Sequence, residues 1–251
     1  MWTTVRISNN TVLITGGATG IGFALAEKFT SLGNKVVICG RRENKLSEAK
    51  AKLPGIEAIR CNIANSGDRE MLYDRISAEF PETNLLVNNA GIQRRIDFTK
   101  GMEDLLNNED EIDINLKAQV HLSALFVPFL MKKESAAIIN VSSGLGFVPL
   151  SMFPVYSATK AALHSFSISL RHQLRNTRVK VFEIVPPTVH DTELKGNPIE
   201  KADWSLSAKE VADATLNGIE SDSYEIGIGA SSAWLSASKD ERDKIFSSIN
   251  H

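Results

Sequence analysis

Short apolar runs alternate with amphipathic segments along most of the chain. Seven runs have the length and composition of buried strands, and most segments between them carry the periodicity or end signals of helices. The expected strands are residues 11–14, 35–39, 56–59, 84–87, 136–141, 179–185 and 225–228. The expected helices are residues 23–29, 43–52, 68–80, about 111–133, 152–176 and 207–219. This alternation predicts an α/β fold, a doubly wound parallel sheet of about seven strands with helices on both faces.

The composition is that of one ordinary globular domain. Of the 251 residues, 43% are hydrophobic and 23% are charged, and no linker or repeat divides them, so we expect a single domain over residues 1–251. The formal charge of −2 provides no basic surface for nucleic acid or for an anionic membrane. Cys39 and Cys61 lie beside apolar runs and are expected to be free core residues. No leader segment opens the chain and no apolar stretch is long enough to span a bilayer, so we expect a cytoplasmic protein.

A glycine-rich turn follows the first expected strand. Gly16, Gly20 and Gly22 stand between that strand and the first expected helix. A backbone without Cβ atoms can approach a pyrophosphate closely, and the N–H groups at the positive end of the helix then hold the anion. Such a turn can also be only structural, but its place in the first β–α unit favours nucleotide binding.

A tyrosine and a lysine stand one helical turn apart. Tyr156 and Lys160 leave the expected helix from the same face. Because a free phenol ionises only near pH ~10, a neighbouring ammonium is expected to lower the pKa of Tyr156 toward the working range of an acid or base. Ser143 follows the strand at 136–141 and is expected at its carboxyl end, where ligands bind in open α/β sheets. Taken alone, Tyr156 and Lys160 are better explained as an ordinary surface pair.

Together these motifs resemble the short-chain dehydrogenase/reductase family. The matching residues follow the family's order and spacing over essentially the whole chain, and they are the turn at 15–22, Asn88 to Gly91, Asn115, Ser143, Tyr156 and Lys160. The resemblance implies a Rossmann-type sheet, a nicotinamide cofactor, and hydride transfer between that cofactor and a small carbonyl or alcohol. Pro186, Pro187 and the residues after Lys160 are similar to a bacterial branch of the family, the DltE-like branch, named for its genetic association with D-alanylation of teichoic acids.

The resemblance also implies a role for each catalytic residue. Tyr156 would be the general acid in carbonyl reduction or the base in alcohol oxidation, and Lys160 would lower its pKa and hydrogen-bond the nicotinamide ribose. Ser143 would orient the substrate oxygen, and Asn115 would hold a water that links Lys160 to solvent. These roles suit the chemistry, because hydride transfer to a carbonyl leaves an alkoxide that needs a proton.

The expected cofactor residues follow from the same resemblance. Asn88 and the residues after it are expected to form a wall beside the cofactor. Asn62 stands where the family usually has an aspartate that bonds the adenine, and its amide oxygen can accept that bond without a charge. Pro187 replaces a family glycine and removes a backbone donor. The full expected set is Gly16, Thr19, Gly20, Ile21, Gly22, Arg41, Arg42, Asn62, Ile63, Asn89, Ala90, Gly91, Tyr156, Lys160, Pro186, Val189 and Thr192.

Cofactor choice depends on the end of the second strand. Arg41 and Arg42 stand there, after Gly40, where an acidic residue would bond the ribose hydroxyls and repel a 2′-phosphate. Two guanidiniums can hold a phosphate by forked, charged hydrogen bonds, so NADP(H) is favoured over NAD(H). One of the two can instead be a solvated charge at a helix start, and Arg41 is the stronger candidate for the phosphate.

The expected substrate wall is mostly apolar, which predicts a small carbonyl or alcohol with a partly hydrophobic body. A short lid at about 188–205, carrying Lys195, Gly196 and Pro198, is expected to move on cofactor binding. His190 on this lid is a candidate polar contact, although a lone loop histidine is more often solvated. No histidine shows metal-ligand spacing, so no metal site is expected. The remaining wall residues are Gln93, Leu145, Phe147, Val148 and Phe153.

Two expected helices carry more apolar residues than one sheet can cover. Residues 115–131 and 156–172 are apolar on more than one face, and family members commonly pair through these helices, so we expect a homodimer or homotetramer. Two other functional classes remain. A catalytically silent nucleotide-binding, sensing or scaffold protein would not need the full catalytic set, and an epimerase or lyase of nucleotide sugars is disfavoured by the short C-terminal region.

Overall fold

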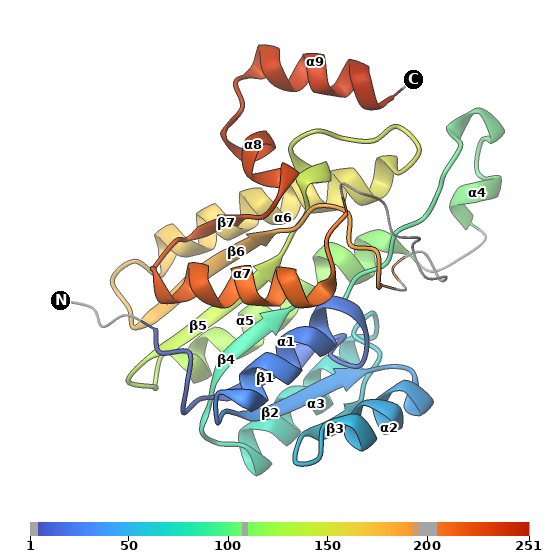
Figure 1. Cartoon of the computed structure of the whole chain (residues 1–251). Coiled ribbons are helices and arrows are strands. Elements are labelled where there is room, and N and C mark those ends of the chain that lie inside the picture. Colours follow the sequence, from blue (N-terminus) through green and yellow to red (C-terminus); the bar gives the residue numbers. More distant parts are fainter. Residues whose placement is uncertain (1–4, 107–109, 193, 195–204, 251) are drawn as a thin grey trace.

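A computed structural model describes residues 5–106, 110–192, 194 and 205–250, and it contains the expected single sheet (Figure 1). All neighbouring strands are parallel, in the order β3-β2-β1-β4-β5-β6-β7. The fold prediction is therefore confirmed. The strands are β1 (Thr11–Thr15), β2 (Lys35–Gly40), β3 (Glu57–Arg60), β4 (Thr83–Asn88), β5 (Ala136–Val141), β6 (Val179–Val185) and β7 (Glu225–Gly227).

Helices cover both faces of the sheet. One apolar core joins α1, α2 and α7 to one face, and a second joins α3, α5 and α6 to the other (Figure 1). In β1, Val12 and Ile14 belong to the first core and Leu13 to the second. Burial on both faces explains why the strands are continuous apolar runs. The main helices are α1 (Gly20–Ser31), α2 (Glu43–Lys52), α3 (Ser66–Glu79), α5 (Ala118–Leu130), α6 (Pro154–Gln173) and α7 (Ala208–Glu220).

Several boundaries differ from the expected ones. The helix expected over 111–133 contains a π-helical turn, Asp113–Lys117, before α5. The helix expected from residue 68 begins at Ser66, because the side chain of Asn65 accepts hydrogen bonds from the first free N–H groups. The capping box of Ser207 and Glu210 at the start of α7 is present as expected. Short helical segments also occur at α4 (Glu103–Leu106), Phe98–Lys100 and Gly144–Gly146.

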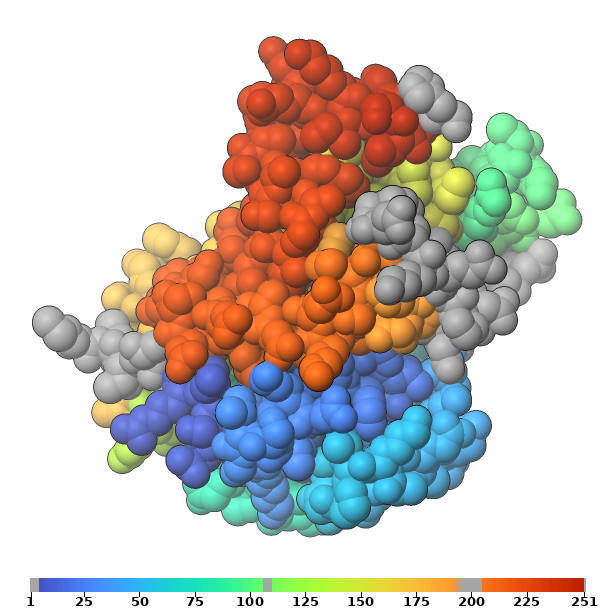
Figure 2. Space-filling view, viewed as in Figure 1, coloured from blue at the N-terminus to red at the C-terminus, as the bar shows by residue number. Residues whose placement is uncertain are grey.

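Two C-terminal helices extend the sheet domain beyond the last expected element. They are α8 (Ala230–Ser236) and α9 (Lys239–Ile249), and Figure 2 shows them rising, in red, above the rest of the molecule. The side chain of Asn250 fastens this region to the loop after β5, accepting from Ser151 N at 2.5 Å and donating to Pro149 O at 3.1 Å. These helices therefore lie over the carboxyl edge of the sheet, next to the loop after β5 that carries Ser143.

Candidate active site

A cleft of about 1540 Å³ opens at the carboxyl edge of the sheet. It lies where β1 and β4 are neighbours and the chain winds away from them in opposite directions, which is the ligand site of open α/β sheets. Its walls come from the glycine turn, the ends of β2 and β3, the segment after β4, the loop after β5, α6 and the loop after β6. Ser143, Tyr156 and Lys160 all line it, together with every expected cofactor residue except Gly22.

The glycine turn is shaped for close approach of a ligand. Gly16 and Gly20 have φ angles of 64° and 54°, in the left-handed region that disfavours a side chain. A Cβ atom on Gly20 would lie 3.0 Å from Cγ2 of Thr192, across the cleft. Gly22 has a different role from the expected one, because its missing Cβ would lie 2.4 Å from the carbonyl oxygen of Gly16. Gly22 is thus needed for the packing of the turn and does not line the cleft.

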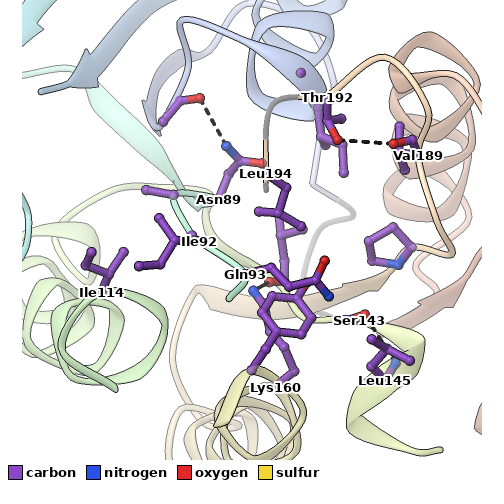
Figure 3. A pocket seen from close by; sticks show the side chains of 18 of the residues that line it. Asn89, Ile92, Gln93, Ile114, Ser143, Leu145, Lys160, Val189, Thr192 and Leu194 are labelled. Atoms are coloured by element: carbon purple, nitrogen blue, oxygen red, sulfur yellow. Dashed lines mark hydrogen bonds between the residues drawn. The ribbon is translucent and has the colours of Figure 1, made fainter. Parts of the chain in front are cut away.

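The wall after β4 is held by hydrogen bonds to the end of β1. The hydroxyl of Thr15 accepts from the backbone N–H groups of Asn89 and Ala90, both at 3.0 Å. The amide of Asn89 donates to Thr15 O at 2.9 Å and to Gly16 O at 3.2 Å, and Figure 3 shows Asn89 among the residues that line the cleft. Asn88 was expected in the same wall, but it points to the other face of the sheet and donates to Asn140 Oδ1 at 2.9 Å. That expectation was wrong, because successive strand residues face opposite ways.

The side chains that are expected to be catalytic lie inside the protein. The exposed fractions of Tyr156, Lys160 and Ser143 are 5%, 3% and 8%. Tyr156 and Lys160 are therefore not an ordinary pair on the protein surface. The Ser143 hydroxyl lies close enough to the Tyr156 phenol to lower its pKa. The Lys160 ammonium donates to Val141 O at 2.7 Å and lies 5.6 Å from the centre of the Tyr156 ring. Figure 3 shows Lys160, Ser143 and Gln93 pointing toward the same part of the cleft.

The pKa values differ from the sequence-based expectation. Burial raises the pKa of Tyr156 to about 12. The hydroxyl of Ser143 opposes this increase, and the negative charge of Glu111 adds to it. Burial also lowers the pKa of Lys160 to about 8, opposed by the negative charge of Glu183. The expected lowering of the Tyr156 pKa by Lys160 is not found in the chain alone. The phenol is therefore protonated across the neutral range, as a proton donor must be.

Asn115 lies behind the cleft wall. It belongs to the π-helical turn, a local irregularity that is frequent at functional sites. Its side-chain oxygen accepts from Ile92 N at 2.8 Å, and its amide donates to Ile92 O at 2.8 Å and to Thr159 Oγ1 at 3.3 Å. These bonds fix the segment after β4 beside α6. The side chain of Asn115 therefore positions this segment, and the expected water between Lys160 and solvent stays a prediction.

The far end of the cleft carries the expected arginines. Arg41 and Arg42 are exposed there, and Arg42 donates to Thr19 Oγ1 at 3.3 Å. Partial burial and the neighbouring Arg42 lower the pKa of Arg41. Asn62 also lines this end, and its side-chain oxygen accepts from Ala64 N at 3.3 Å.

The opposite end of the cleft is apolar, but its lining differs from the expected wall. Gln93, Leu145 and Phe153 line it as expected. Phe147 does not, and its ring instead lies 4.5 Å from the ring of His164. His190 also faces away, with Nδ1 3.0 Å from Ser205 Oγ. Val148 is fully buried outside the cleft.

The expected lid and apolar helices are described in part. Lys195, Gly196 and Pro198 fall outside the described residues, whereas the backbone oxygen of Leu194 accepts from Gln93 N at 3.2 Å. On α5 and α6, apolar residues divide between the core and the outer face. Ile168 is 44% exposed. No helix in the described part of the chain is both long and apolar enough to cross a membrane.

Several lining residues were missed from the sequence. Ser231 and Trp234 of α8 and Ile249 of α9 line the cleft, as do the charged residues Arg94, Arg95 and Asp104. The sequence carried one signal for this region, because Ser238 and Glu241 have the spacing of a capping box, and they form one at the start of α9. No pattern in the neighbouring residues indicates that this helix packs near the loop after β5.

Comparison with known proteins gives the family of this chain. The model of the short chain dehydrogenase family matches residues 10–203, and the chain belongs to that family. It is an NAD(P)-dependent oxidoreductase of the DltE-like branch, since it is 48% identical to the uncharacterized oxidoreductase DltE of Bacillus subtilis, over 98% of each chain. It is also 33% identical to the NADP-dependent 3-hydroxy acid dehydrogenase YdfG of Escherichia coli K12, over 72% of this chain and 73% of the relative.

Solved structures have the same fold. A short-chain dehydrogenase from Burkholderia cenocepacia in complex with NADP has a TM-score of 0.80 and 25% identity, over 97% of this chain and 98% of its own. A family member from Burkholderia phymatum in complex with NAD also has a TM-score of 0.80, with 24% identity over 91% of this chain and 92% of its own. Both nicotinamide cofactors therefore occur among the structural neighbours.

Proposed function

We propose that this enzyme transfers hydride between NADP(H) and a small carbonyl or alcohol, with Ser143, Tyr156 and Lys160 in direct contact with the reactants and Asn115 as support. The observation that carries the proposal is the burial of these three side chains on one wall of a cleft whose other end carries two arginines. A catalytically silent nucleotide-binding protein would not need a buried phenol, hydroxyl and ammonium in one place.

The cleft fits a dinucleotide. Gly16 and Gly20 have positive φ angles and line the cleft, and without side chains they leave the backbone of the turn open to a ligand. The first N–H groups of α1 lie at this turn and favour a pyrophosphate. Ile63, Ala90 and the other expected cofactor residues would flank the cofactor. Arg41 and Arg42 would hold the 2′-phosphate, because no acidic residue stands at the end of β2 to repel it.

The chain's own residues supply the proton chemistry. When bound, the nicotinamide supplies or accepts the hydride. The hydroxyls of Ser143 and Tyr156 both donate to the substrate oxygen, and that bond strengthens as negative charge develops there. Tyr156 then gives its proton to the forming alkoxide. A phenol with a pKa of about 12 is fully protonated at neutral pH, so the resting site is poised for carbonyl reduction. Lys160, with a pKa of about 8, is the nearby group that can restore the proton.

The substrate end favours a compact molecule with an apolar body. Leu145, Phe153 and Trp234 supply apolar surface, and Arg94, Arg95 and Asp104 add charged groups to the lining of the same cleft. Hydroxy acids and their keto forms therefore belong beside neutral ketones and aldehydes in a substrate panel. The printed activity of the 3-hydroxy acid dehydrogenase relative supports the same choice.

The test begins with titration of the purified protein by NADPH and NADH, followed by a carbonyl panel monitored by loss of reduced nicotinamide absorbance. We expect NADPH to bind and at least one carbonyl to be reduced. Tyr156→Phe should retain NADPH binding and lose about 10²- to 10⁴-fold in rate, the usual contribution of a general acid. Failure of both nucleotides to bind refutes the proposal, whereas full activity of the variant refutes only the role of Tyr156.

A homodimer or homotetramer is part of the same proposal. Ile168 is exposed on α6, and Leu125, Phe129 and Phe166 are only half-buried on the outer side of α5 and α6. A second copy packed against these helices would cover this apolar surface. Light scattering on the purified protein gives the mass directly, and a monomer would refute this part.

A further inference from the structure

A row of polar side chains crosses the sheet beneath α5 and α6. Asn88, Asn140, Glu183 and Glu225 stand directly opposite one another on β4, β5, β6 and β7. They lie on the same face as Leu86, Ile138 and Val181, which belong to the core under α3, α5 and α6. The row therefore lies at the carboxyl end of that apolar core, between the core and the active-site cleft.

Glu183 is the buried charge in this row. Its side chain is 0% exposed. One carboxylate oxygen lies 2.7 Å from Nδ1 of His164, and the other has no hydrogen-bond partner among the residues that the structure describes. A buried carboxylate is costly unless a positive charge compensates it. The expected catalytic and cofactor residues do not include Glu183 or His164, and the proposed mechanism has not used them.

Lys160 reaches the same place from α6. Tyr156, Lys160 and His164 follow one another at intervals of four residues, so they lie on one face of the helix. The Lys160 ammonium donates to Val141 O at 2.7 Å, and Val141 stands opposite Ile184, the neighbour of Glu183. His164 bonds Glu183 directly, so the carboxylate lies on the α6 side of β6. Lys160 and Glu183 are thus both buried beneath α6 near the ends of β5 and β6, and their opposite charges influence each other there without direct contact.

A metal ion is a poorer explanation of this cluster. Ligand atoms of His164, Glu183 and Glu225 lie within 4.8 Å of one another. However, the ring of His164 and the carboxylate of Glu183 already share a hydrogen bond, and Glu225 is paired with Arg171 at 3.0 Å. With Lys160 and Arg171 balancing the two carboxylates, a divalent ion would leave an uncompensated charge of about +2 in a buried site.

We propose that Glu183 is the counter-charge of Lys160, a positioning residue that, oriented by His164, keeps the ammonium charged and in place beside Tyr156. The electrostatics point the same way, since Glu183 is the group that raises the pKa of Lys160 against the effect of burial. The hydrogen bond to Glu183 likewise raises the pKa of His164, against the effect of partial burial. The charge pair itself does not depend on the proposed function, but its catalytic consequence does.

Other charges face the pair and are included in the reasoning. Arg171 on α6 and Glu225 on β7 act on His164 in opposite directions. Arg242 of α9 lies 5.3 Å from the ring of Phe147, which contacts His164. Glu111 faces Tyr156 from the other side. The substitution Glu225→Gln is therefore the matched control, because it removes the same charge from the neighbouring strand of the same row.

The test follows the ionisation of Lys160 by NMR in the chain without nucleotide. Protein carrying ¹³C-labelled lysine is titrated with pH, and the Lys160 signal is assigned by its loss in Lys160→Arg. We expect a midpoint near pH 8 in the wild type. Glu183→Gln should lower that midpoint by about 1 to 3 pH units, the usual effect of a close opposite charge. Glu225→Gln should leave it in place.

A second variant avoids dependence on the folding of Glu183→Gln. Lys160→Met removes the ammonium, so Glu183 keeps only His164 as its partner, and the midpoint of the His164 ring signal should rise. An unchanged Lys160 midpoint in Glu183→Gln, an equal shift in Glu225→Gln, or an unmoved His164 midpoint in Lys160→Met overturns the proposal. Because these titrations need neither nucleotide nor substrate, a protein that fails to bind NADPH would refute the proposed function and leave this result standing.

Discussion

The cofactor preference gives a sharp test of the site, because it depends on two side chains at one end of the cleft. In the double variant Arg41→Ala, Arg42→Ala, the guanidiniums that would hold a 2′-phosphate are removed. A well-made hydrogen bond between charged groups contributes about 1.5–3 kcal/mol. Both arginines are exposed, so screening by solvent and salt reduces this, and we take about 1 kcal/mol for each.

The expected loss for NADPH is therefore about 2 kcal/mol, or about 30-fold in Kd. NADH has no 2′-phosphate, so its Kd should change by less than about threefold, within the ±0.5 kcal/mol typical of surface substitutions. Quenching of protein fluorescence, or fluorescence of the reduced nicotinamide, measures both values at one fixed ionic strength. The wild-type affinity for NADPH should also fall more steeply with salt than that of the variant.

Arg95→Ala is the matched control for this experiment. It removes the same charge from the segment after β4, another part of the lining of the same cleft, so it should leave the ratio of the NADPH and NADH affinities unchanged. Two results would refute the reasoning. One is an equal loss of both nucleotides in the double variant, and the other is a retained preference for NADPH without the two arginines.

Three further predictions concern the rest of the site. The rate of carbonyl reduction should fall as the pH rises through about 8, because Lys160 then loses its proton, and a rate unchanged up to pH 10 would contradict this. Gly22→Ala should weaken NADPH binding and lower the free energy of unfolding by about 1–3 kcal/mol, since the new methyl group meets a backbone oxygen at 2.4 Å. Denaturant unfolding measures this loss of stability. Gly67→Ala is the control, because the atom nearest to its new Cβ would be 3.3 Å away. Asn250→Ala should loosen the packing of α9 and raise KM for bulky carbonyls, while the Kd for NADPH stays unchanged. An unchanged KM would show that α9 does not contribute to substrate binding.

The sequence by itself determined the fold and the reacting groups. Strand and helix periodicity, the glycine turn and the spacing of Tyr156 and Lys160 are local properties, written in residues that stand near one another in the chain. For the same reason Ser143 could be placed at a strand end and Arg41 at the end of β2. Each of these residues does line the cleft.

Only the tertiary structure decided what surrounds those groups. It turned Asn88 and Phe147 away from the cleft, brought α9 over the loop after β5, and buried the carboxylate of Glu183 against His164 beneath α6. It also raised the pKa of Tyr156 where proximity to an ammonium alone predicted a decrease. The physical reason is that burial and cross-strand partners arise from residues far apart in the chain, and desolvation at such contacts can outweigh the effect of a neighbouring charge.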